Sequence, residues 1–403
     1  MSLCFGMLTC SNLAGRRLAG RLIGTALLLS LAVAAPAQWA IQNSNTTADL
    51  RGIHAVDGKV AWASGTNGTV LRTVDGGANW QTCAIPPGTE RLDFRGIQAF
   101  DAKIAIVMSS GKGDLSRLYK TTDGCQTWKL VFTNPDKDGF WDALYFVDKL
   151  NGWLLGDPVK DGFVLYVTVN GGKAWIRQHN KGLRANPSQQ GAFAASNSSL
   201  TASSSVMWFG GLNFASGGKE GAFVYSDVQF VTCLDYCPVT EGLLEGRPRK
   251  WEKQPVPIGI HSESSGIFSL AQREGQLPGG FDRVMVAVGG DYQKPADSEA
   301  TAAFTMGYGK GWTAAETPPH GYRSAVAWDA AAKEWITVGP NGTDVSTDDG
   351  KNWTALRPDF ARGEAADADR NWNALSLPFV VGPKGRIGKL DQVPASKVQG
   401  SSK

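Results

Sequence analysis

Arginines recur in this sequence beside short apolar segments, in a pattern that suits anion binding. Arg51 and Arg95 each follow an aspartate by two residues and precede a Gly-Ile pair. Guanidinium groups stay charged and bind carboxylates through two parallel hydrogen bonds. Aligning the repeated stretches by their first apolar segment places five polar residues at one shared position: Arg51, Arg95, Asp142, Arg323 and Asn373. If the fold gathers these positions, we expect a surface that binds an acidic protein segment or a small anionic ligand.

A structural role for the arginines is equally compatible with the sequence. Asp49 stands beside Arg51, and Asp93 stands beside Arg95. Local ion pairs of this kind brace neighbouring elements and imitate functional clusters. Both interpretations remain open at this point, and they are compatible with each other.

Other candidates for the same surface follow glycine or proline turns near the ends of predicted strands. These are Asp157, Asp291, Tyr292, His320 and Tyr322. Histidine as a residue type can act in proton transfer, but a single histidine in a Pro-Pro-His-Gly loop is typical of a surface residue. We therefore assign no catalytic base.

The elements that position these residues are indicated by an eight-residue repeat. Each copy has a hydroxyl residue, an acid or amide two residues later, a glycine and a closing tryptophan, as in Thr73–Trp80, Thr121–Trp128, Thr168–Trp175 and Ser346–Trp353. The first three tryptophans are 48 and 47 residues apart. A period of roughly 40–50 residues built from short strands is typical of a β-propeller. We therefore predict an all-β, seven-bladed propeller over residues 38–391.

The chemistry of the repeat favours a tight turn. An Asp or Asn side chain accepts hydrogen bonds from backbone N–H groups just ahead of it, and glycine supplies the positive φ of the corner. The tryptophan then begins the next strand and buries a large ring. Structural roles are thus expected for the acid or amide and for the tryptophan of each copy: Asp75, Trp80, Asp123, Trp128, Asn170, Trp175, Asp348 and Trp353.

The middle and the ends of the chain depart from the repeat. Residues 180–205 are rich in Gly, Ser and Asn and are predicted to form a loop beside a degenerate fourth blade. The seventh blade, starting at Trp372, is one strand short. We expect Gln38–Gln42 to supply that strand and close the ring, and the polar tail 392–403 to be disordered.

The first 37 residues have the pattern of a secretory signal peptide. Basic residues precede the apolar block Leu22–Ala34, and a small-x-small site follows at Ala35–Ala37. We expect export to the periplasm or beyond, with no membrane-spanning segment. Cleavage leaves 37 basic and 37 acidic residues, a balance that argues against nucleic-acid binding.

Four cysteines remain after the predicted cleavage site: Cys83, Cys125, Cys233 and Cys237. Export permits disulfides, and Cys83–Cys125 with Cys233–Cys237 is one possible pairing. The four histidines show no metal-ligand spacing, so no metal site is expected.

The eight-residue copies resemble the Asp-box (BNR) repeat of the sialidase-like propellers. In that superfamily the repeat is structural and lies away from the active face, which agrees with the roles expected from turn chemistry.

Longer stretches resemble the photosystem II stability/assembly factor family of propellers, including its relatives in non-photosynthetic bacteria. They extend over nearly the whole chain after residue 37: Asp93–Ile97, Gly156–Pro158, Val288–Asp291, Thr317–Arg323 and Asn341–Asp348. In the photosynthetic members an arginine-rich face contacts protein partners during assembly of a membrane complex. The resemblance implies that Arg51, Arg95 and Arg323 form the matching face.

A glycoside hydrolase of sialidase type is the alternative. Such enzymes need paired carboxylates, or a tyrosine nucleophile with a partner acid, and the sialidase family adds three arginines. The sequence has Arg51-Gly-Ile53 where that family has Arg-Ile-Pro, and no acid–tyrosine pair is recognisable. Bacterial relatives are also labelled oxidoreductases, yet no dinucleotide, haem or redox cysteine motif occurs. The sequence thus favours a non-catalytic binding or assembly scaffold without a cofactor.

Overall fold

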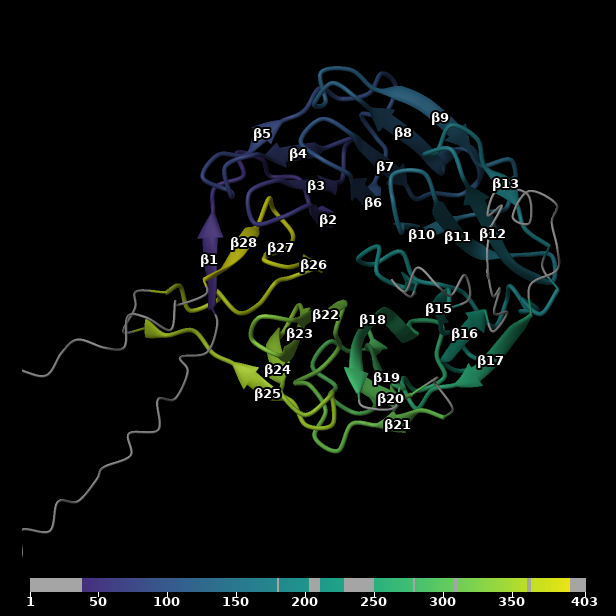
Figure 1. Cartoon of the computed structure of the whole chain (residues 1–403), viewed down its shortest axis with the longest axis vertical. Coiled ribbons are helices and arrows are strands. Elements are labelled where there is room, and N and C mark those ends of the chain that lie inside the picture. The colour runs from purple at the N-terminus through teal and green to yellow at the C-terminus, as the bar shows by residue number, and fades with distance from the viewer. Residues whose placement is uncertain are drawn as a thin grey trace, which may run out of the picture. The chain divides into compact units, whose positions relative to one another are not determined.

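A computed structural model describes residues 38–179, 181–202, 211–227, 250–277, 280–307, 311–360 and 364–391. The predicted signal peptide, the polar tail, Cys233 and Cys237 lie outside the described residues. Within these ranges the strands form seven four-stranded antiparallel sheets. Figure 1 shows the sheets arranged radially around one axis, so the predicted seven-bladed β-propeller is confirmed.

The first three blades follow the repeats predicted from the sequence, with strand order along the chain running outward from the axis. Blade 1 consists of β2 (Leu50–Ala55), β3 (Ala61–Gly65), β4 (Val70–Thr73) and β5 (Gln81–Thr82). Blade 2 consists of β6 (Phe94–Ala99), β7 (Ala105–Ser109), β8 (Arg117–Thr121) and β9 (Lys129–Thr133), with a 3-10 turn, η1 (Gly113–Leu115), before β8. Blade 3 consists of β10 (Trp141–Phe146), β11 (Gly152–Val159), β12 (Gly162–Thr168) and β13 (Ile176–Arg177).

The remaining blades are less regular. Blade 4 consists of β14 (Leu200–Thr201), β15 (Asn213–Ser216), β16 (Phe223–Asp227) and β17 (Trp251–Pro255). Blade 5 consists of β18 (Ser265–Leu277), β19 (Gly280–Asp291), β20 (Ala302–Met306) and β21 (Thr313–Ala314). Blade 6 consists of β22 (Ala325–Asp329), β23 (Glu334–Gly339), β24 (Gly342–Ser346) and β25 (Thr354–Leu356). Blade 7 consists of β26 (Ala374–Ser376), β27 (Phe379–Val381), β28 (Ile387–Asp391) and β1 (Gln38–Gln42).

The hydrophobic core lies between adjacent blades. One cluster joins Leu50, Leu71 and Trp80 of blade 1 to Ala374 and Phe379 of blade 7. The second strands of blades 1 and 2, β3 and β7, have neighbours on both sides and on both faces and are buried throughout. Strands buried on both faces read as apolar runs of small and branched residues, which is the pattern of these segments. No helix in the described ranges is long and apolar enough to cross a membrane.

Strand β1 closes the ring, as the sequence predicted. It pairs antiparallel with β28, from Gln38 opposite Asp391 to Gln42 opposite Ile387. Trp39 is 2% exposed and lies 6.1 Å from the Trp372 ring. Its indole N–H donates a 3.0 Å hydrogen bond to Oγ1 of Thr343 in blade 6. The first strand of the propeller therefore anchors the last blade to its neighbour.

The eight-residue repeat forms the same hydrogen-bonded turn in all four copies. In the first, the Thr73 hydroxyl donates to Oδ1 of Asp75 and accepts from the Gly77 N–H, and Asp75 accepts from the Asn79 N–H. The residue that bonds to the hydroxyl has positive φ each time: Gly77, Cys125, Gly172 and Gly350. The turn chemistry expected for Asp75, Asp123, Asn170 and Asp348 is thus present in the structure.

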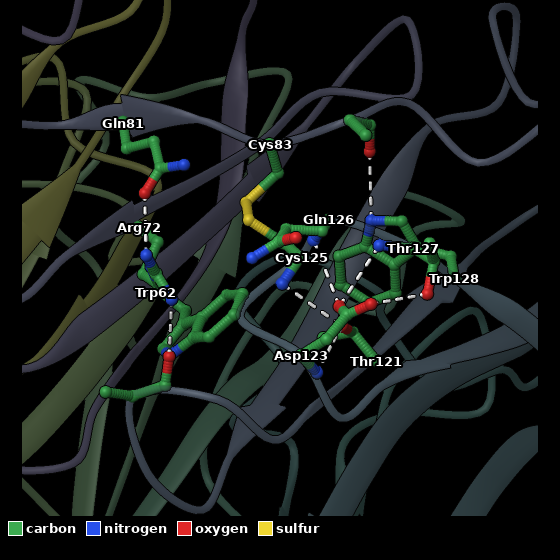
Figure 2. Close-up of a disulfide and its surroundings, with 12 residues drawn as sticks. Trp62, Arg72, Gln81, Cys83, Thr121, Asp123, Cys125, Gln126, Thr127 and Trp128 are labelled. Atoms are coloured by element: carbon green, nitrogen blue, oxygen red, sulfur yellow. Dashed lines mark hydrogen bonds between the residues drawn. A yellow bond between two sulfur atoms is a disulfide. The ribbon is translucent and has the colours of Figure 1, made fainter.

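Cys83 and Cys125 form a disulfide that joins blade 1 to blade 2 (Figure 2). Cys83 directly follows β5, and Cys125 occupies a glycine position of the second eight-residue turn. The indole N–H of Trp128 in the same turn donates to the carbonyl of Ala84. The disulfide joins cysteines that are 42 residues apart in the sequence. Loop entropy suggests that a cross-link of this span stabilises the folded state by roughly 3–4 kcal/mol.

The loop predicted for residues 180–205 has a more specific course. Its last part forms β14, the short inner strand of blade 4. The preceding stretch, Gly191–Ser199, leaves the blade and contacts the inner strands of other blades. We call this stretch the axial segment. The sequence did not predict these contacts, because a stretch rich in Gly, Ser and Asn indicates only a loop.

Candidate binding face at the propeller axis

The side chains that meet near the axis come from one equivalent position in each blade, at the start of its innermost strand. The pairing of the first two strands is interrupted by a single unpaired residue in four blades, and a bulge of this kind re-aims a side chain. The unpaired residues are Arg51, Arg95, Asp142 and Phe268. In blades 6 and 7 the residues just before the first paired ones, Ser324 and Asn373, correspond to them.

Arg323 is therefore one residue out of the register predicted from the sequence. It matches Leu50, Phe94 and Trp141, which precede the bulges and are buried. Arg323 is itself fully buried, and its guanidinium binds the buried carboxylate of Asp344. The expectation that Arg323 contributes to an accessible arginine surface is corrected accordingly.

Arg51 and Arg95 lie on either side of one carboxylate. Nε of Arg95 donates a 2.8 Å hydrogen bond to Oδ2 of Asp93, whereas Nε of Arg51 is 3.8 Å from Oδ1 of the same group. Arg95 also donates to the carbonyl of Ala194 in the axial segment, at 3.2 Å. Arg51 makes no hydrogen bond through its guanidinium to any described residue, and its side chain is 31% exposed. Two cations share one anion, which leaves this part of the face positive.

Asp142, the bulge residue of blade 3, is buried. Burial raises its pKa well above the usual range, the carboxylate of Asp157 raises it further, and Arg95 opposes the shift. Burial likewise raises the pKa of Asp157 to about 6, against the effect of a hydrogen bond from the Ala192 N–H to its Oδ1. Asp157 therefore supports the base of the axial segment through this hydrogen bond, and the buried Asp142 is not presented to solvent.

The axial segment bridges inner strands from four blades. Asn197 accepts from the Leu144 N–H and donates to the carbonyls of Leu144 and Ile97. Ser196 donates to the carbonyl of Ser324, and Ser198 bonds to Ser269 across 2.7 Å. These bonds reach blades 2, 3, 5 and 6, so the segment forms a floor across the axis below Arg51 and Arg95.

Aromatic residues occupy the blade 5 side of this floor. The Phe193 and Phe268 rings stack with centroids 4.0 Å apart, and Tyr322 meets Phe268 edge-on at 4.8 Å. Tyr292 lies 6.1 Å from Phe268 and is 49% exposed. Tyr322, a predicted candidate for this surface, is instead buried. Burial raises its pKa well above the usual value, the nearby Tyr292 adds to the shift, and the charge of Arg51 opposes it.

The remaining predicted residues have structural partners. Asp291 is mostly buried and caps its own turn by accepting from the Gln293 N–H. Nδ1 of His320 is 2.5 Å from Oδ1 of Asp344, so the histidine joins the pair that Arg323 forms. Asn373 donates to the carbonyl of Leu50 and links blade 7 to blade 1. In the part of the chain that the structure describes, no cluster of three or more His, Cys, Asp or Glu could hold a metal ion.

Comparison with solved structures identifies propellers of the same architecture. One covers 88% of this chain and 97% of its own, with a TM-score of 0.53 and 17% identity, and the other covers 88% and 98%, with a TM-score of 0.52 and 18% identity. Both are structures of YCF48. The first is YCF48 bound to D1 peptide, and the second is YCF48 from Cyanidioschyzon merolae.

The YCF48 structures confirm the resemblance to the photosystem II assembly factor propellers at the level of the fold. At 17% and 18% identity they carry nothing further about this chain. No family model matches the sequence, and no curated protein matches it.

Sequence reasoning missed the features that depend on register and on long-range contacts. Phe268 occupies the register position that corresponds to Arg51, but the sequence did not reveal the bulge that places it there. Phe193 lies in a stretch of small residues that resembled a simple loop. A large aromatic residue inside such a stretch was the available signal.

Proposed function

We propose that this protein is an exported, non-catalytic binding scaffold whose axial face recognises an acidic peptide segment through Arg51. The observation that supports this proposal best is the environment of the Arg51 guanidinium. It is held at the face, 3.8 Å from a carboxylate that already binds Arg95, and it lacks a hydrogen-bond partner among the described residues. A half-buried arginine with unused donors binds an incoming carboxylate strongly, because the charged hydrogen bonds form in a partly dehydrated place.

The two arginines have different roles in this proposal. Arg95 is bonded to Asp93 and to the axial segment, so it holds the floor and orients the shared carboxylate. Arg51 is free to bind the ligand. That YCF48 was solved bound to a D1 peptide supports a peptide as the class of partner. Export is proposed from the signal-peptide pattern of residues 1–37, and association with a membrane complex from the family resemblance.

The test is binding of a fluorescein-labelled hexaglutamate peptide, with a hexaglutamine peptide as the neutral probe. We expect anisotropy titrations of the wild-type protein to show binding of the acidic peptide alone. Arg51→Gln should weaken this binding by about tenfold or more, since one bidentate charged pair contributes roughly 1.5–3 kcal/mol.

Lys384→Gln is the matched control, because it removes the same charge from an exposed residue whose N–H bonds to Asp49, two residues before Arg51. The control should change the affinity less than twofold. Equal losses in both variants would show a general charge effect, and absence of binding by the wild type would reject the proposed acidic partner.

A further inference from the structure

Charged and aromatic side chains occupy equivalent register positions in different blades around the axis. The bulge residue is arginine in blades 1 and 2 and phenylalanine in blade 5. The residue at this position in blade 6, Ser324, is small and accepts a hydrogen bond from the axial segment through its carbonyl. One side of the face can therefore bind an anion, and the other side offers rings.

The rings are held in place from below. Phe193 packs against the antiparallel bridge that Gly217 of blade 4 forms with Gly266 of blade 5. A Cβ atom on either glycine would come within 3.0 Å of Cε2 of the Phe193 ring. The absence of both side chains makes room for Phe193, which stacks on Phe268 and supports it from the axial segment. An ordered ring surface has little conformational entropy left to lose when a ligand binds.

Tyr292 is the exposed member of this set. It follows β19, its ring is 49% exposed, and it meets the buried Phe268 at an interplanar angle of 80°. Aromatic rings left half in water on a rigid support are typical of recognition surfaces, since they bury large areas at low entropic cost.

Short contacts connect the Arg51 guanidinium to the aromatic set. Nε of Arg51 lies 3.8 Å from the Asp93 carboxylate, which also binds Arg95. Arg95 donates in turn to the carbonyl of Ala194, the residue that follows Phe193 in the axial segment. A ligand that binds Arg51 therefore reaches the rings with an adjacent group.

We propose that Tyr292 and Phe193, with Arg51, form a composite site for a peptide segment in which an aromatic or large apolar side chain neighbours a carboxylate. This inference rests on the proposed function and adds its specificity. Arg51 binds the carboxylate, and the neighbouring side chain packs on Tyr292 over the Phe193–Phe268 pair.

The test compares two acetylated, amidated peptides that share a Gly/Ser backbone with two glutamates. One carries 4-fluorophenylalanine beside the glutamates, and the other carries alanine there. We expect the fluorinated peptide to bind the wild-type protein roughly threefold to tenfold more tightly, the range that aromatic packing supplies. Its fluorine resonance should shift and broaden on binding.

Three variants separate the contributions. Tyr292→Ala should abolish the advantage of the aromatic peptide, whereas Tyr292→Phe should keep it. Arg51→Gln should weaken both peptides by a similar factor. The side chain of Tyr292 is half exposed, so its removal leaves the core intact, and circular dichroism verifies the fold of each variant.

The outcomes distinguish the two proposals. If both peptides bind equally in an Arg51-dependent way, or if the aromatic advantage survives Tyr292→Ala, the composite site is wrong and the acidic-segment proposal stands. If neither peptide binds the wild type, the proposed function fails, and the composite site fails with it.

Discussion

Arg51 and Arg323 show how one residue type takes opposite roles one register step apart. Arg51 is the unpaired residue of a bulge and reaches the axial face. Arg323 stands at a position occupied by large apolar side chains in other blades, so its charge is buried and must be compensated. A charge buried without its partner costs several kcal/mol.

Arg323→Met should lower the free energy of unfolding by roughly 3–5 kcal/mol, because it leaves the buried Asp344 carboxylate with His320 as its remaining partner. Chemical denaturation measures the change. Arg51→Gln should stay within about 0.5 kcal/mol, as is usual for surface sites. Adding Asp344→Asn to Arg323→Met should recover part of the loss, and equal stability of wild type and Arg323→Met would contradict the buried pair.

Two partly buried groups, His54 and Asp157, give the stability opposite dependences on pH over one window. Burial lowers the pKa of His54 to about 4, so the folded state keeps this ring neutral and loses stability as the pH falls from about 6.5 to 4. Burial raises the pKa of Asp157 to about 6, so the folded state binds this proton more readily and gains stability as the pH falls from about 6 to 4. The two contributions largely cancel in the wild type.

Single variants should reveal each dependence. His54→Gln removes the first contribution, so stability should fall less than in the wild type as the pH is lowered from 6.5 to 4. Asp157→Asn removes the second, so stability should fall more steeply than in the wild type. Each difference spans roughly 1–3 kcal/mol. Urea denaturation at half-unit pH steps measures it, and profiles parallel to the wild type would show that these groups keep ordinary pKa values in the fold.

Among the elements, β1 stabilises the fold in a way its length does not suggest. Its five residues connect blade 7 to blade 6 through Trp39 and to blade 1 through Gln42, which accepts a hydrogen bond from the Trp80 indole. Pairing with β1 also covers the edge of β28.

Trp39→Ala should cost roughly 3–5 kcal/mol of unfolding free energy, the usual range for removing a large buried aromatic side chain. Ile41→Ala is the control, since Ile41 lies on the same strand and is 45% exposed. Thermal and urea denaturation should rank the variants in this order. Similar losses for both would mean that pairing with β28, rather than the tryptophan, holds the strand.

At the scale of the whole molecule, the sequence predicted the repeated blades and missed the features that occur in only one of them. The spacing of Trp80, Trp128 and Trp175 was enough to predict the propeller, and the missing strand of blade 7 was enough to predict ring closure. The prediction aligned Arg323 with Arg51 and Arg95 because all three are arginines, but strand pairing sets the register and puts Arg323 one residue earlier. The axial segment was missed because its bonds join residues far apart in sequence, as between Asn197 and Ile97.

Ring closure also bears on how the chain is made. Gln38 pairs with Asp391, 353 residues later, so the first strand to be synthesised is completed by the last. Contacts of such sequence separation form slowly, because the intervening chain must be ordered first. Until then β1 keeps an unpaired edge that other strands can bind. Removing only β28 would accordingly leave six blades with their strands but no closed ring, and the product should associate with other chains during synthesis.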